Sequence, residues 1–331
     1  MLSFLVHRIG GMILTMLAVS VMVFAIMELP PGDYAERYMF RKASGSGIAI
    51  TEADIQNVRV KFGLDRPAPE RYFNWITNIV TDFDFGQAFA YETTVNKVIG
   101  DRLWLTLAIL YSTLILTYIL AIPIAIYAAV RRHSLPDYSL TVFSYLGLAL
   151  PNFLLALIML YISVTIFDTS VGGLFSEEYV GQPWSWGKFT DLLAHLIVPA
   201  IVLAWSATAL QLQTVRSTML DELNKLSVTA ARARGVPEKR LLLKYPARLA
   251  INPVISTIGF DVNRIFSELP IVALVLSLPE LGELLIKSYL DLDMNVAGAI
   301  LLMLTFFIVV MNFVSDLLLA LVDPRIKLQG G

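Results

Sequence analysis

The amino-acid sequence predicts an all-α integral membrane protein with six transmembrane helices and one large basic cytoplasmic loop. Of its 331 residues, 56% are hydrophobic and only 16% are charged, whereas soluble domains carry about a quarter charged residues and fewer apolar ones. The apolar residues gather in long runs without charge. A helix needs about 20 such residues to cross the hydrocarbon, and a helix satisfies its own backbone groups there. The absence of cysteine excludes disulfides, thiolate metal sites and a cysteine nucleophile.

The first apolar run, 9–29, is compatible with a signal peptide or with a retained helix. Secretory apolar regions span about 7–15 residues and end at a small-residue cleavage site. This run is longer, ends at Glu28-Leu29-Pro30-Pro31, and is followed by further apolar runs. We therefore expect a retained first transmembrane helix.

The remaining apolar runs predict five more spans. The segment 30–102 between the first two spans predicts a folded extracytoplasmic cap, with Tyr72 and Trp75 in a short amphipathic helix. Pro151-Asn152 predicts a kink inside the third span. No internal repeat or low-complexity linker divides the chain, so we expect one membrane domain over 1–331. The further spans are 103–130, 138–167, 192–215, 249–278 and 294–322.

Basic residues predict the orientation of these spans. The loop 131–137 contains Arg131 and Arg132, whereas the opposite loops 168–191 and 279–293 hold one lysine each and several acids. Because short loops rich in Lys and Arg stay on the cytoplasmic side, both termini are expected in the cytoplasm, as Arg8, Arg325 and Lys327 also suggest. The loop 216–248 follows the same rule, with Arg216, Lys225, Arg232, Arg234, Lys239, Arg240, Lys244 and Arg248.

The centre of this loop, 229–249, reads TAARARGVPEKRLLLKYPARL. The segment 217–234 favours a helix, and Gly235 can close it because glycine adopts positive φ without strain. Pro237 and Glu238 suit the start of a second helix. Composition alone leaves two interpretations open. The charges either only fix the topology or belong to a surface on which a partner docks.

The order of these residues resembles the cytoplasmic coupling loop of binding-protein-dependent ABC importer permeases. The resemblance rests on AARARG, then PEKR, then PARLAINPVIS, and is strongest for the dipeptide and oligopeptide permease family. It covers the whole chain, in HRIGGMILTMLAVSVMVFAIMELPPGD, FGLDRPAPERYFNWI, DFDFGQAF, LPELGELLIKSYLDLDMNVAGAI and LVDPRI. Two positions depart from the family pattern. Thr229 stands where the general motif has Glu, and Glu280 replaces a usual Gly.

The resemblance implies a type I ABC importer permease fold in a bacterial or archaeal cytoplasmic (inner) membrane. It further implies a second homologous permease subunit, two ABC ATPase subunits, a periplasmic solute-binding protein and the lipid bilayer as partners, with no nucleic acid. The chain itself is expected to be non-catalytic and without cofactor, with ATP and Mg²⁺ on the ATPases. The implied coupling residues are Thr229, Ala230, Ala231, Arg232, Arg234, Gly235, Glu238 and Arg240.

The sequence itself contains no nucleotide-binding or metal-binding motif. A phosphate-binding loop needs G-x-x-x-x-G-K-[ST], and the nearest string, Gly187-Lys188-Phe189, lacks the hydroxyl residue and the upstream glycine. The three histidines are scattered, which does not support a metal site. The energy for transport is therefore expected to come from other chains.

The fifth span contains an unusual set of charges. Asp261, Arg264 and Glu268 recur at i, i+3 and i+7 and so share one helix face, with Asn263 nearby. Charges within a membrane are costly and usually face a cavity or mark function. Relatives more often have Gln and Gly here, so the family does not supply this cluster. We expect these residues to line the translocation path; the alternative is that Arg264 only pairs with Asp261, Glu268 or a partner subunit.

Two questions about function stay open: which solute is transported, and whether the chain is instead an intramembrane enzyme or a passive channel. The family moves dipeptides, oligopeptides, nickel chelates, glutathione and oligosaccharides, and selectivity resides mainly in the binding protein. Peptides are the expected solute and oligosaccharides the alternative. An intramembrane enzyme would need a base near Ser206 or Ser256, where no histidine is placed. A passive channel would not need a basic coupling loop.

Overall fold

The computed structural model describes residues 2–29, 35–36, 38–40, 43, 51–166 and 172–322. The chain packs as two compact units, the first of residues 1–12, 105–283 and 308–331, the second of residues 13–104 and 284–307. The expected features at Pro31-Gly32-Asp33 and at 323–331, with Arg325 and Lys327, lie outside the described residues. One membrane domain over 1–331 stays a prediction.

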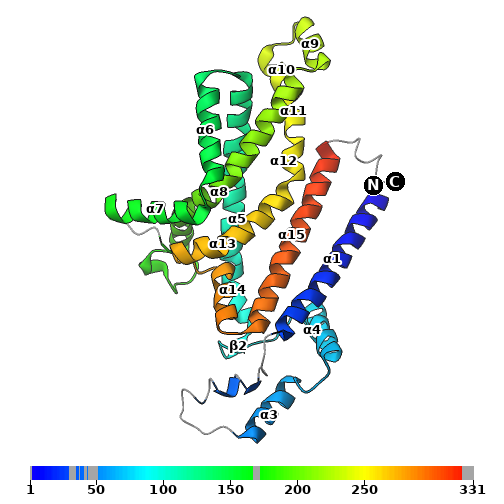
Figure 1. Ribbon diagram of the computed structural model, residues 1–331, viewed down its shortest axis with the longest axis vertical. Coiled ribbons are helices and arrows are strands. Elements are labelled where there is room, and N and C mark those ends of the chain that lie inside the picture. Colours follow the sequence, from blue (N-terminus) through cyan, green and yellow to red (C-terminus); the bar gives the residue numbers. More distant parts are fainter. Residues whose placement is uncertain are drawn as a thin grey trace. The chain divides into compact units, whose positions relative to one another are not determined.

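Within the described residues, four helices are long and apolar enough to cross a membrane, and two bent helix pairs raise the number to six if each pair is one span (Figure 1). The four are α1 (Leu2–Glu28), α5 (Val95–Val130), α8 (Trp186–Leu223) and α15 (Met294–Val322). The bent pairs are α6 (Leu135–Ala149) with α7 (Asn152–Ile166), and α13 (Ile258–Leu276) with α14 (Leu281–Leu290).

The third predicted span, 138–167, is broken and not merely kinked. α6 and α7 meet at an angle of 101°, because the proline ring forces the preceding residue out of the helical region. Leu150 is accordingly extended, with φ −90° and ψ 122°. The carbonyl of Pro151 then accepts the N–H groups of Leu154 and Leu155 at 3.0 and 3.2 Å and starts α7.

The fifth predicted span, 249–278, is also divided. It contains the end of α11 (Pro246–Ala250), then α12 (Asn252–Ser256) and α13. Pro246 and Pro253 each lie in the first turn of their helix, where the missing N–H costs least. After α13 the chain turns by 83° into α14. α5 begins at Val95 and α8 covers Trp186–Leu223, so both helices extend beyond the predicted spans 103–130 and 192–215.

Small residues let the helices of the first unit pack closely. Ala121, Ala125 and Ala129 of α5 are buried in one cluster with apolar residues of α8, α11 and α12, as small interfacial residues allow in membrane bundles.

An ion pair between Asp137 and Arg216 joins α6 to α8. The Arg216 guanidinium donates two hydrogen bonds to the Asp137 carboxylate, from Nε at 2.6 Å and from Nη2 at 2.8 Å. The loop before α8 carries one 3₁₀ turn, η1 (Glu177–Tyr179).

The second unit contains α3 (Glu52–Phe62), α4 (Ala68–Asp82) and a short hairpin. The hairpin pairs β1 (Gln87–Ala88) with β2 (Thr93–Thr94) in antiparallel register. The predicted short helix with Tyr72 and Trp75 is confirmed as α4. Tyr72 and Trp75 both pack on Phe24 of α1, with ring centroids 5.5 and 6.0 Å away.

Glu280 acts as the N-terminal cap of α14. Its carboxylate is fully buried and accepts the N–H groups of Gly282 and Glu283 at 2.6 and 2.7 Å. It also accepts the hydroxyl of Thr106 at 3.3 Å, and that hydroxyl oxygen accepts the N–H of Leu281 at 2.9 Å. The departure from glycine at this position therefore has a structural role.

We predict that Glu280→Ala destabilises the protein by about 2 kcal/mol, because a lost cap leaves buried N–H groups without an acceptor. The measurement is the thermal unfolding midpoint of the purified protein in detergent. Glu280→Asp is the control, because aspartate is a preferred cap residue and should recover most of the loss. Equal midpoints for wild type and Glu280→Ala would show that the cap contributes nothing.

Candidate functional site

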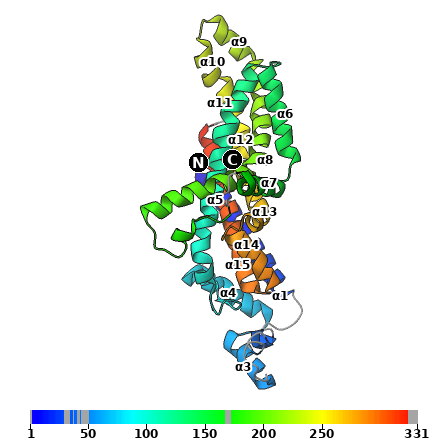
Figure 2. The ribbon, with the colours of Figure 1, turned by 90° about the vertical axis from the view of Figure 1, so that its left-hand side faces the viewer.

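The basic loop forms two short helices, α9 (Leu226–Ala233) and α10 (Glu238–Lys244). Both lie at one end of the first unit, beyond α8 and α11, in each view (Figure 1, Figure 2). The sequence favours one helix over 217–234, but the structure interrupts it at Asn224 and Lys225. The Asn224 side chain donates to the carbonyl of Leu220 at 3.0 Å, and this bond competes with continuation of the helix.

Gly235 closes α9 in the left-handed conformation, with φ +75°. The N–H of Gly235 donates to the carbonyl of Arg232 at 3.0 Å, and that of Val236 donates to Ala231 at 3.3 Å. This pair of bonds is a Schellman motif, which satisfies the last carbonyls of a helix and reverses the chain. The sequence-based expectation for Gly235 is therefore confirmed.

A small apolar core holds α9 against α10. Val228, Ala231 and Leu241 are at most 1% exposed and pack together with the partly buried Val236. Val228 and Leu241 were not predicted from the sequence, although Val228 and Ala231 have the i, i+3 spacing of one helix face. Because the core fixes the pair of helices, the outer face of α9 has a defined shape.

An ion pair closes the turn from outside. The Arg232 guanidinium donates to both carboxylate oxygens of Glu238, from Nε at 3.2 Å and from Nη2 at 2.6 Å. These hydrogen bonds hold the pKa of the Glu238 carboxyl below its usual value, so the carboxylate stays ionised at neutral pH. The remaining predicted coupling residues are exposed: Thr229, Ala230, Arg234 and Arg240.

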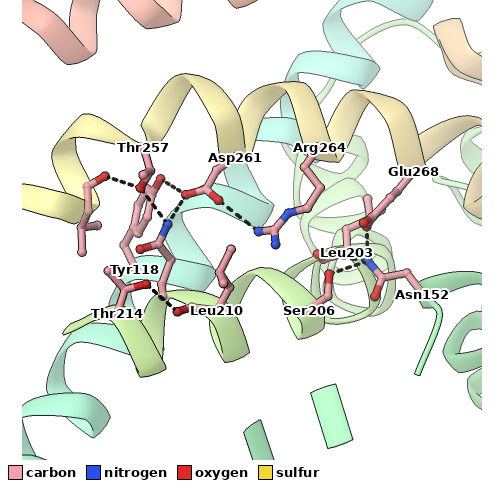
Figure 3. Close-up of polar contacts among 12 residues, drawn as sticks. Tyr118, Asn152, Leu203, Ser206, Leu210, Thr214, Thr257, Asp261, Arg264 and Glu268 are labelled. Carbon is pink, nitrogen blue, oxygen red and sulfur yellow. Dashed lines mark hydrogen bonds and ion pairs between the residues drawn. The ribbon is translucent and has the colours of Figure 1, made fainter. Parts of the chain in front are cut away.

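The charged residues of α13 form a polar cluster within the membrane helices (Figure 3). Asp261 is the buried centre. Its carboxylate accepts from the Tyr118 hydroxyl at 2.8 Å, the Gln211 amide at 2.6 Å and Arg264 Nη2 at 3.0 Å. The Gln211 amide also donates to the Thr257 hydroxyl at 3.0 Å. The protein thus supplies the hydrogen bonds that a buried carboxylate needs.

Glu268 belongs to a neighbouring group at the start of α7 (Figure 3). The Asn152 amide donates to its carboxylate and also to the Ser206 hydroxyl at 3.2 Å. Asn152 is itself buried, at 6% exposure, and is placed there by the break at Pro151. The bend between α6 and α7 therefore supplies a polar side chain to the charged face of α13.

The structure places three of the four predicted path residues on one side of α13 and the fourth on another. Asp261, Arg264 and Glu268 point to the same side of α13 (Figure 3). Arg264 pairs with Asp261 and retains 24% side-chain exposure. Asn263 instead lies on an exposed face with Ser267, whose hydroxyl donates to the Asn263 carbonyl at 2.8 Å. The alternative expectation, an Arg264–Asp261 pair, is present in the structure.

Sequence reasoning missed the partners of this cluster. Tyr118, Gln211 and Thr257 are polar residues inside apolar runs, and such residues seek hydrogen bonds within a membrane. That signal was available, but their meeting point depends on how α5, α8 and α13 pack. The spacing along one helix could not reveal it.

Within the described residues, Ser206 is not placed for hydrolysis. Ser206 accepts from an amide and not from a base. Within the described ranges, no group of three or more His, Asp or Glu side chains could hold a metal ion. Lys188 of the Gly187-Lys188-Phe189 string is buried, donates to the Gln182 carbonyl at 2.6 Å and lies 4.9 Å from the Phe175 ring centroid. The arrangement is that of a helical scaffold with a polar cluster among its helices and an exposed basic loop.

Comparison with known proteins agrees with this arrangement over the full length. Residues 121–328 match the family described as binding-protein-dependent transport system inner membrane component, and residues 1–110 match the N-terminal part of such membrane components. A putative peptide permease protein of Brucella ovis is 32% identical over 99% of both chains. The oligopeptide transport system permease protein AppB of Bacillus subtilis is 33% identical over 99% of this chain and 100% of its own length.

A more distant relative is named for a different solute. The nickel import system permease protein NikB of Staphylococcus aureus is 26% identical over 99% of this chain and 92% of its own length. The family model covers more than half of the chain, and full-length relatives exceed 30% identity. The chain is therefore a member of the family of inner membrane components of binding-protein-dependent transport systems.

Proposed function

We propose that this chain is one of two homologous permease subunits of an ATP-driven importer for dipeptides and oligopeptides. A periplasmic binding protein delivers the solute, and two ABC ATPase subunits dock on the cytoplasmic loop. Both termini face the cytoplasm. The observation that carries the proposal is the loop of α9 and α10, a small, rigidly braced pair of helices with an exposed outer face.

The loop has the properties that a mechanical coupling element needs. Its core of Val228, Ala231 and Leu241 and its Arg232–Glu238 pair fix its shape. Its outer face exposes small residues, including Ala230, and the apolar Leu226, which is 87% exposed. Small side chains permit close approach of a partner groove. Closure of the ATPases on ATP and Mg²⁺ would then move α9 and the helices that continue from it, as rigid-body rocking requires.

The polar cluster of α13 supports a path for a charged solute. Arg264 keeps part of its side chain exposed, while Asp261 fixes its position. A cation and a carboxylate on one helix face suit a peptide with two charged termini. The Brucella and Bacillus relatives are named as permeases for the same class of solute. The NikB relative makes a nickel-bearing solute the second candidate.

Uptake into proteoliposomes tests the proposal. The assembled transporter is reconstituted with ATP on the ATPase side and with the binding protein and radiolabelled tripeptide on the other. We expect accumulation of the tripeptide against its gradient, and none with a non-hydrolysable ATP analogue. Accumulation of a nickel chelate or an oligosaccharide in place of the peptide would change the substrate class. Equal flux with and without ATP would instead identify a passive channel.

A further inference from the structure

The second unit contains a pocket of about 760 Å³ that neither the coupling loop nor the α13 cluster uses. Its walls come from the end of α1, the loop between α3 and α4, one face of α4, the hairpin and the start of α15. Pockets for small ligands typically measure about 300–1,000 Å³. The volume is therefore sufficient for a short peptide.

One face of α4 forms a wall of this pocket. Arg71, Asn74, Trp75 and Asn78 line it, and their i, i+3, i+4, i+7 spacing places them on one side of the helix. The Trp75 ring is held 6.0 Å from the ring of Phe24. The wall thus combines a fixed aromatic surface with two amides and a guanidinium.

The loop between α3 and α4 adds positive charge. Gly63 ends α3 in the left-handed region, with φ +65°, and the chain turns so that Lys61 and Arg66 also line the pocket. Among the lining residues that the structure describes, Glu28 is the one acidic residue, and it pairs with Arg71. The described part of the lining therefore carries more positive than negative charge and favours an anionic ligand.

Two hydrogen-bond donors on these walls lack an acceptor. Arg71 Nε and Trp75 Nε1 are buried and make no hydrogen bond in the part of the chain that the structure describes. A buried donor without an acceptor is unfavourable, and such groups in native proteins usually have a partner. Because neither atom is exposed, a ligand oxygen would reach these two donors only after the side chains of Arg71 and Trp75 move.

We propose that this pocket binds the C-terminal end of a short peptide, with the carboxylate beside Lys61 and Arg71. The amides of Asn74 and Asn78 suit the peptide backbone, and the aromatic wall at Trp75 suits an apolar side chain. This inference rests on the proposed peptide import and adds a peptide site on the permease itself. A protein partner is the weaker fit, because stable protein interfaces bury about 1,000 Å² or more, whereas this feature is a single concave pocket.

Equilibrium binding of a defined peptide tests the site. The assembled transporter in nanodiscs, without the solute-binding protein, is titrated with fluorescent Ala-Phe-Ala and with its C-terminal amide, using microscale thermophoresis. We expect the amide to bind about tenfold more weakly, since it lacks the charge that the cations recognise. Lys61→Gln and Trp75→Phe should each weaken binding of the free acid about threefold to tenfold, the effect of one lost polar contact.

Matched substitutions in the same unit serve as controls. Lys97→Gln and Trp104→Phe change exposed residues outside the lining and should leave the affinity unchanged. Equal affinities for acid and amide, no detectable binding, or equal losses in test and control variants would overturn the inference. So would a peptide that binds only when the binding protein is added. Tripeptide uptake by the wild type is measured separately. Uptake without binding at the pocket rejects only this inference, whereas absent uptake rejects the proposed function.

Discussion

Replacing Ala230 by Glu is expected to abolish ATP-driven uptake while leaving the permease folded. Ala230 is exposed on α9, and the side chains that brace this helix, Val228 and Ala231, lie on its buried face. A glutamate at position 230 therefore leaves the core between α9 and α10 undisturbed. In the docked state it would enter the ATPase groove, where an unpaired charge is strongly unfavourable. We expect the amount of co-purified ATPase and the uptake rate each to fall by about tenfold or more, the usual effect at an interface hot spot.

The same substitution on another helix separates docking from general damage. Ala53 is exposed in the first turn of α3 in the second unit, where a carboxylate suits the helix N-terminus. Ala53→Glu should leave the yield of ATPase and the uptake unchanged. If Ala230→Glu retained both, α9 would not be the docking helix.

Replacing Arg264 by Leu is expected to reduce uptake by about tenfold, while the complex with the ATPase persists. Arg264 provides the partly exposed cation of the α13 cluster and donates to the buried Asp261. Loss of the cation removes a charged contact that a peptide carboxylate would make, and such contacts are worth about 2 kcal/mol or more when desolvated. The measurement is peptide uptake together with ATPase activity of the assembled transporter.

A double variant separates a role in the path from a role in stability. Arg264→Leu leaves Asp261 buried with Tyr118 and Gln211 as its donors among the described residues, and breaking a buried pair costs about 3 kcal/mol or more. Combining Arg264→Leu with Asp261→Asn removes the unpaired charge. If Arg264 contacts the solute, uptake stays low in the double variant although stability recovers. Recovery of uptake with stability would show that the pair is only structural.

The sequence predicted the helices and the turn better than the contacts between helices. Apolar runs located α15 and the end of α1 to within one residue, and Gly235 identified the end of α9. These features depend on local chemistry. The break at Pro151 was underestimated because proline predicts a disturbance of the helix but not its angle, which neighbouring helices determine.

In the candidate site, too, the features of one helix could be predicted and the contacts between helices could not. The face of α13 with Asp261, Arg264 and Glu268 followed from spacing alone. Its partners Tyr118 and Gln211 could not be assigned, because they come from α5 and α8 and meet Asp261 only after packing. The pocket of the second unit was not predicted for the same reason, since its lining combines segments far apart in the chain.

Native mass spectrometry of the complex captured through this chain tests the central claim most directly. The complex is purified from the membrane with its partners, including the solute-binding protein and the ligand that it carries. We predict a mass that accounts for this chain, a second homologous permease and two ATPases, with a peptide released from the binding protein. A chain that purifies without any ATPase would contradict the account, because the loop of α9 and α10 would then have no coupling role.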